Sequence, residues 1–137
     1  MNFIEPTAKR LIIQKSTSQQ LEVSCLVYKC KNDTLNKHSR TYMIVLNVIS
    51  TSSSLNQELL PMENLVLAFN SGKNGPISTT LMGYSSLDTY VEQFAKRLSI
   101  RFNSKITLSL NGALTNEQRQ LLEKVLIEYL TSLNKQD

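Results

Sequence analysis

The chain has 137 residues, which favours one domain whose core is large enough to fold without a metal ion or a disulfide. Hydrophobic residues make up 41% and charged residues 19% of it, and only 4 glycines and 3 prolines occur, which excludes fibrous and low-complexity proteins. The net charge of +4 is mild and spread along the sequence, so an acidic protein surface explains it as well as a phosphate backbone does.

Two strands are predicted in the N-terminal third. Residues 10–15 alternate weakly between apolar and polar, and residues 21–27 alternate clearly, which is typical of a half-buried strand. Cys25 and Cys30 lie an odd number of positions apart in or just after the second strand, so they point to opposite faces and cannot easily form a disulfide. We therefore expect two reduced thiols, as in an intracellular protein.

No segment predicts export or membrane insertion. Residues 1–10 lack the apolar stretch of a signal peptide, and no apolar run approaches the roughly 18 residues that a membrane helix needs. We expect a protein of the cytoplasm or the nucleus that does not bind a membrane.

Residues 41–49 predict a strand that is apolar on both of its alternating faces. Such a strand either lies at the centre of a sheet, covered on both sides by helices of its own chain, or belongs to an interface. We take one of its faces as the first set of candidate partner-binding residues, namely Tyr42, Ile44, Leu46 and Val48.

The polar loop that precedes this strand is basic and carries the second set of candidates. Lys31, Lys37 and Arg40 could steer the chain toward an acidic surface, and the alternative is an ordinary solvated run of charges.

The C-terminal half predicts two more hairpin strands, a helix, a strand and a final helix. Residues 65–69 and the segment from Pro76 form the strands around a turn-rich stretch, and a helix capped by Ser86 ends at Asn103. Residues 106–110 alternate as a strand, and Thr115 begins a capping box ahead of a helix with a wide apolar stripe. Together these elements predict an α+β fold, an antiparallel β-sheet of about six strands flanked by two main α-helices, in a single domain over residues 1–137.

The sequence holds no pattern of reactive residues. Its one histidine, His38, lies in a polar loop without a nucleophile beside it, and one histidine with two divergent cysteines does not make a zinc site. Gly72 and Lys73 lack the flanking residues of a phosphate-binding loop. We therefore predict no catalytic residues, no cofactor and no metal, in a protein that acts by binding.

Three consecutive segments carry a family resemblance: residues 76–83, the helix with Ala95-Lys96-Arg97-Leu98, and the stretch from Arg101-Phe102-Asn103 to Leu110. They resemble the small proteasome assembly chaperones, in particular the chaperone 4 family and its near relative, the chaperone 3 family. The resemblance implies an antiparallel sheet with helices and a heterodimer of a chaperone 3 and a chaperone 4. It also implies binding to alpha subunits of the 20S proteasome, notably alpha-5, to promote alpha-ring formation without catalysis.

Two other functions are compatible with parts of the sequence. A small dimeric scaffold of a GTPase-regulating or trafficking complex could have the same fold, and its co-purified partners would distinguish it. A nucleic-acid binder is disfavoured, because the sequence lacks a strand that combines basic and stacking aromatic residues.

Overall fold

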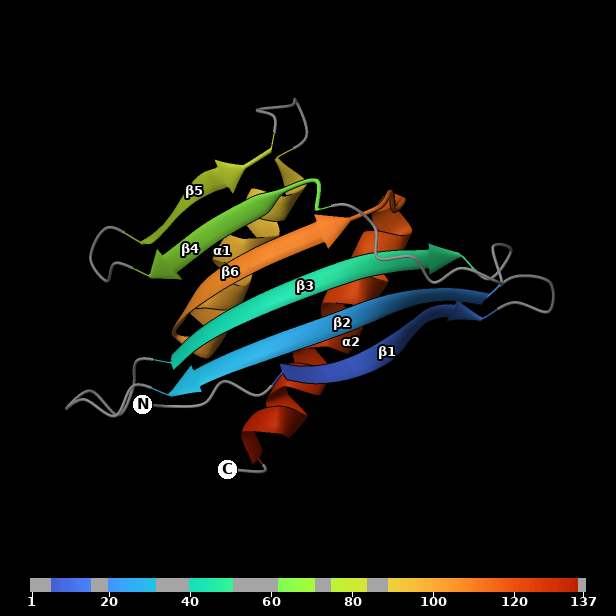
Figure 1. Cartoon of the computed structure of the whole chain (residues 1–137), viewed down its shortest axis with the longest axis horizontal. Helices are drawn as coiled ribbons and strands as arrows, with labels where there is room; N and C mark the ends of the chain where they lie inside the picture. Colours follow the sequence, from blue (N-terminus) through green and yellow to red (C-terminus); the bar gives the residue numbers. More distant parts are fainter. Residues whose placement is uncertain are drawn as a thin grey trace.

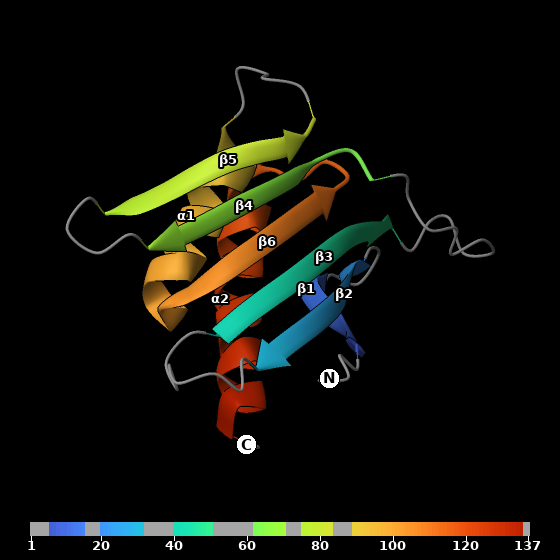
Figure 2. The same ribbon diagram turned by 60° about the vertical axis from the view of Figure 1, so that its left-hand side comes forward.

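The structure, a computed structural model, describes residues 6–15, 20–31, 40–50, 62–70, 75–83 and 89–135. These residues form one six-stranded sheet and two helices. Figure 1 shows both helices on the same face of the sheet, and Figure 2 shows the same arrangement from the side. The elements in chain order are β1 (Pro6–Lys15), β2 (Gln20–Lys31), β3 (Arg40–Ser50), β4 (Leu65–Asn70), β5 (Pro76–Met82), α1 (Tyr90–Phe102), β6 (Ser104–Asn111) and α2 (Asn116–Lys135).

The strand order is β1-β2-β3-β6-β4-β5 (Figure 1). An antiparallel sheet is expected from the sequence, and four of the five strand pairings described are antiparallel. The pairing of β3 with β6 is parallel, so the sheet is mixed. The parallel pair arises because the last strand inserts between the two antiparallel groups after the chain has crossed over through α1.

One hydrophobic core lies between the sheet and the helices. It forms because every second residue of the strands faces the helices, as the period of two in β2 and β6 requires. Helix α1 packs over β4, β5 and β6, and α2 packs against β1. The fully buried side chains with the largest volumes are Tyr42, Phe94, Leu11, Ile44, Leu46, Leu98, Ile106, Leu108, Leu122, Leu126, Leu130 and Val23.

The helix ends confirm several local predictions and correct one. Asn103 ends α1 in the left-handed conformation, with φ 45° and ψ 53°. The capping box of α2 is formed, because the Gln118 backbone N–H donates to Thr115 Oγ1 at 3.2 Å while the Thr115 N–H donates to Gln118 Oε1 at 2.8 Å. Helix α1, however, begins at Tyr90 with Thr89 as its N-cap, and the predicted cap at Ser86 lies outside the described residues.

No helix in the described part of the chain has the length and apolar character needed to cross a membrane.

Candidate partner-binding surface

The helices cover only one of the two faces of the sheet, and we call the other one the open face (Figure 1). It is defined by the strand residues that alternate with the buried ones. Leu26, for example, lies between Cys25 and Val27, both of which are at most 1% exposed, and is itself only partly buried. The open face therefore consists of the side chains of six strands that no described helix covers.

A row of side chains crosses five strands on this face. Tyr28 of β2 is opposite Met43 of β3, and Met43 is opposite Thr107 of β6. Thr107 is in turn opposite Leu67 of β4, which is opposite Thr79 of β5. Directly opposed residues have Cβ atoms about 4.5–5.5 Å apart, so these side chains form a continuous strip.

Large apolar side chains on the same face remain strongly exposed. Phe69 of β4 and its cross-strand partner Ile77 of β5 are 36% and 42% exposed, and Ile12 of β1 is 49% exposed. Scattered apolar residues such as Ile12 are normal on a protein surface, but neighbouring exposed ones such as Phe69 and Ile77 are typical of an interaction site.

A buried polar network closes one end of the open face. The Asn111 Nδ2 group donates to Asn47 Oδ1 at 2.9 Å and to Ser109 Oγ at 3.1 Å, and Asn111 Oδ1 accepts from the Glu63 backbone N–H at 2.6 Å. All three side chains of Asn47, Ser109 and Asn111 are at most 8% exposed. Because buried amides that satisfy one another fix a single geometry, this network sets the register of β3 and β6 further along the two strands than the strip.

Asn64 continues the network at the start of β4. Its Oδ1 accepts from the Leu110 N–H at 2.9 Å and its Nδ2 donates to the Leu110 carbonyl at 2.6 Å. The Asn64 side chain thus makes the two hydrogen bonds to the Leu110 backbone that a neighbouring strand would otherwise make. The pairing of β4 with β6 begins beyond it, at Val66.

The first set of predicted partner-binding residues lies mostly in the core. Tyr42, Ile44 and Leu46 face the helices and are at most 1% exposed, so in the folded chain a partner cannot reach them. Val48 is partly buried on the same side. The correction follows from the two apolar alternations of β3. The structure buries the even-numbered one, and the odd-numbered one, with Met43 and Val45, is on the open face.

Of the three basic candidates, only Arg40 has a side chain among the described residues. Arg40 is the first residue of β3 and is partly buried. Lys37 lies outside the described residues, as does the side chain of Lys31. Sequence reasoning did not single out Leu26, Phe69 and Ile77 of the open face, for which the available signal was an apolar residue on the second alternation of each strand.

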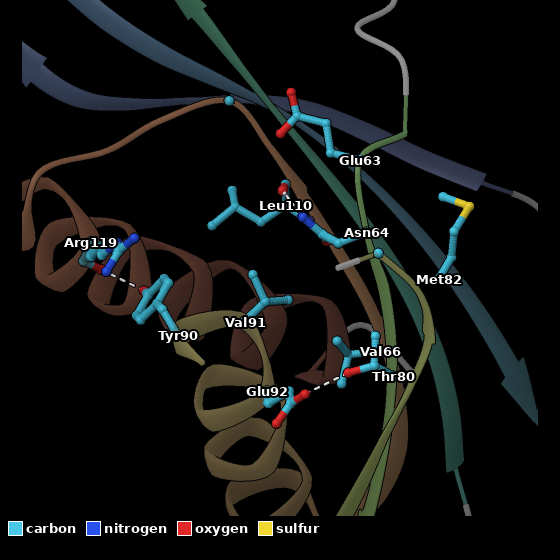
Figure 3. Close-up of a pocket in the computed structure, with 12 residues that line it drawn as sticks. Glu63, Asn64, Val66, Thr80, Met82, Tyr90, Val91, Glu92, Leu110 and Arg119 are labelled. Carbon is cyan, nitrogen blue, oxygen red and sulfur yellow. Dashed lines mark hydrogen bonds between the residues drawn. The ribbon is translucent and has the colours of Figure 1, made fainter. Parts of the chain in front are cut away.

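A cleft of about 280 Å³ lies between α1, α2 and the ends of β4, β5 and β6 (Figure 3). Several of the polar side chains that line it contact neighbouring side chains. Tyr90 donates to Glu123 Oε2 at 3.2 Å, and Thr80 donates to Glu92. The Arg119 guanidinium lies 4.3 Å from the centroid of the Tyr90 ring. These contacts fasten the helices to each other and to β5.

Two titratable groups of the core are held neutral at physiological pH. Burial raises the pKa of the Cys25 thiol to about 12. Burial, with the Glu123 carboxylate as a second cause, raises the pKa of the Tyr90 hydroxyl. A raised thiol pKa is typical of an inert, structural cysteine. Within the described residues no group of three histidine, cysteine, aspartate or glutamate side chains could hold a metal ion.

Comparison with known proteins identifies one family. The family model described as proteasome assembly chaperone 4 matches residues 34–111, which is 78 of the 137 residues. Among solved structures, a chain from a chaperone complex for yeast 20S proteasome assembly is 13% identical, with 96% of each chain covered and a TM-score of 0.47. No curated protein matches the chain.

Proposed function

The chain belongs to the proteasome assembly chaperone 4 family, and on that premise we propose that it acts in 20S proteasome assembly as a non-enzymatic chaperone. The family match over more than half of the chain is the observation that carries this function. A chaperone of this kind needs complementary surface and no reactive group, and the paired polar residues of the cleft agree with that requirement.

We propose further that the open face is where the chain forms a heterodimer with a related small chaperone of the chaperone 3 type. Two sheets that pack face to face bury their apolar sides about 10 Å apart. The strip from Tyr28 to Thr79 and the exposed pair Phe69 and Ile77 offer such a side, while the helices close the other one. Burial of large exposed side chains is the main favourable term in association.

The heterodimer is then proposed to bind alpha subunits of the 20S proteasome, alpha-5 among them, and to promote alpha-ring formation. This step is supported by the family alone. A chaperone that guides assembly binds an intermediate more tightly than the finished particle, since only a difference in affinity between two states can shift an equilibrium.

A charge on the open face tests the dimer surface. Met43→Asp places a carboxylate in the middle of the apolar strip, whereas Ile100→Asp places the same group on the exposed face of α1, where Ile100 is 51% exposed. Each variant is co-expressed with the chaperone 3 of the same organism and the complex is measured by light scattering and titration. We expect Met43→Asp to weaken the heterodimer by roughly 2–4 kcal/mol, about 30- to 1,000-fold, and Ile100→Asp to leave it unchanged. Equal affinities of a folded Met43→Asp chain and the wild type would reject the open face as the dimer surface.

The assembly role is tested separately by capture of the tagged chain from its native cells. We expect free alpha subunits and one small chaperone without mature beta subunits. Recovery of GTPases or trafficking subunits in their place would contradict the assembly role, whatever surface the dimer uses.

A further inference from the structure

A second surface lies at the opposite edge of the core from the cleft, between β1 and α2. It is a groove of about 410 Å³, lined on one side by four consecutive residues of β1 and on the other by four residues of α2. The α2 residues recur at the spacing of one helix face, so the helix presents a single wall that runs along the strand. The lining consists of Lys9, Arg10, Leu11, Ile12, Val125, Glu128, Tyr129 and Ser132.

The strand that forms one wall is an edge of the sheet. In the described part of the chain, β1 pairs with β2 on one side and has no strand on the other (Figure 1). An edge strand presents a row of backbone N–H and C=O groups that can pair with another extended chain. An open edge beside a helix wall is the arrangement in which peptide-binding domains add a strand to their sheet and place alternate side chains in the groove.

The basic residues of β1 favour an acidic ligand in the groove. The sequence of β1 contains Lys9, Arg10 and Lys15 and no acidic residue. Lys9 faces α2, with its Nζ 4.8 Å from the centroid of the Tyr129 ring. Arg10 faces the other way and forms an ion pair of 3.6 Å with Glu22. Glu128 is the one acidic residue of the lining. A second copy of β1 would oppose basic residues to basic residues, whereas an acidic segment would be attracted.

We propose that this groove binds an extended acidic segment of a protein partner as an added strand on β1. One acidic side chain of the segment pairs with Lys9, and a neighbouring apolar side chain on the same face packs against Val125 of the α2 wall. The proposal rests on the edge strand and the groove, not on the open face. The chain would therefore have two binding surfaces that can be occupied together, a sheet face and a sheet edge.

The probe is a fluorescent peptide of about seven residues that presents glutamate and valine on one face and threonine on the other. The control peptide has lysine in place of glutamate. With the full chain, we expect fluorescence anisotropy to give saturable binding of the glutamate peptide, about tenfold or more tighter than the lysine peptide. Equal binding of the two peptides, or no saturation up to about 1 mM, would overturn the proposal.

Variants of the chain test whether the peptide binds in the groove between β1 and α2. Lys9→Glu should reverse the preference between the two peptides, and Ser132→Tyr, which fills the groove from α2, should abolish binding of both. Lys124→Glu makes the same charge change at an exposed residue of α2 outside the groove and should leave the affinity unchanged. An affinity that Lys9→Glu does not alter, or that Lys124→Glu alters as much, would overturn the assignment to the groove.

Methylation of the peptide backbone tests strand addition itself. A strand directs alternate N–H groups toward its neighbour, so methyl groups on one alternate set of amides should abolish binding and those on the other set should be tolerated. Equal effects of the two methylated peptides would refute an added strand. Self-association of the unliganded chain that Lys9→Glu strengthens would identify a second copy as the occupant and would also overturn the proposal.

Discussion

Replacing Gly112 by alanine should destabilise the fold more than the same change at Gly75. Gly112 follows β6 and has a φ of +109°, and a Cβ there would lie 2.7 Å from the Cβ of Val48. Gly75 has a φ of +75°, and a Cβ there would meet nothing within 4 Å. Both positions use the freedom of glycine at positive φ, but only Gly112 also uses its lack of a side chain.

The magnitudes follow from these two terms. A positive φ at alanine costs about 1–3 kcal/mol, and forcing a methyl group into a packed site adds about 1–3 kcal/mol. The lower entropy of the unfolded alanine chain offsets about 0.4–1 kcal/mol in both variants. We therefore expect the free energy of unfolding to fall by about 1–6 kcal/mol for Gly112→Ala and by about 0–3 kcal/mol for Gly75→Ala.

The assay is urea unfolding followed by circular dichroism, with the melting temperature as a second measure. For a chain of this length each kcal/mol lowers the melting temperature by about 3–4 °C. Equal losses for the two variants would refute the reasoning, because the close approach of residue 112 to Val48 would then contribute nothing.

Further predictions concern single contacts. Tyr42 donates from its hydroxyl to Asn134 Oδ1 at 2.6 Å, so Tyr42→Phe should lower the free energy of unfolding by about 0.5–1.5 kcal/mol. An unchanged urea midpoint would show that this hydrogen bond makes no net contribution to stability. Thr115→Ala removes the N-cap of α2 and should lower the free energy of unfolding by about 1 kcal/mol, because the helix then frays from its N-terminal end. Cys30, which is partly exposed, should react with a maleimide in the folded chain at neutral pH, while Cys25 should stay unlabelled until urea is added; simultaneous labelling in mass spectrometry would contradict the burial. Because the folded pKa of the Cys25 thiol, about 12, lies above its ordinary value of 9.0, its contribution to stability should be complete below pH 9 and be lost as the pH rises above it. Cys25→Ala should reduce that alkaline loss, and an identical pH profile would exclude the thiol as its source.

Local structure could be predicted where one physical rule dominates. The alternation of β2 and β6, the left-handed end at Asn103 and the capping box at Thr115 each depend on a few neighbouring residues, and all are present. The strand β1 is longer than the weak alternation of residues 10–15 indicates, because pairing with β2 extends it back to Pro6.

The arrangement of the strands could not be predicted in the same way. Nothing in residues 104–111 indicates that they pair in parallel with β3, since that pairing depends on where the chain returns after α1. Both alternations of β3 are rich in apolar residues, since the odd-numbered one holds Met43, Val45 and Ile49, so apolar content alone did not decide which face packs against the helices. The sequence therefore indicated a strand with two apolar faces, but the side chains chosen as partner-binding candidates, Tyr42, Ile44 and Leu46, lie in the core.

Because β6 inserts between β3 and β4, the sheet can be completed only late in the synthesis of the chain on the ribosome. Once Ser50 has left the ribosome, β1, β2 and β3 can form a meander, but the outer edge of β3 must wait for Ser104 to Asn111. At translation rates of about 5–20 residues per second, the 61 residues from 51 to 111 take roughly 3–12 s. During that interval an apolar strand with a free edge is exposed to other nascent chains. This assembly chaperone therefore needs protection from aggregation during its own synthesis.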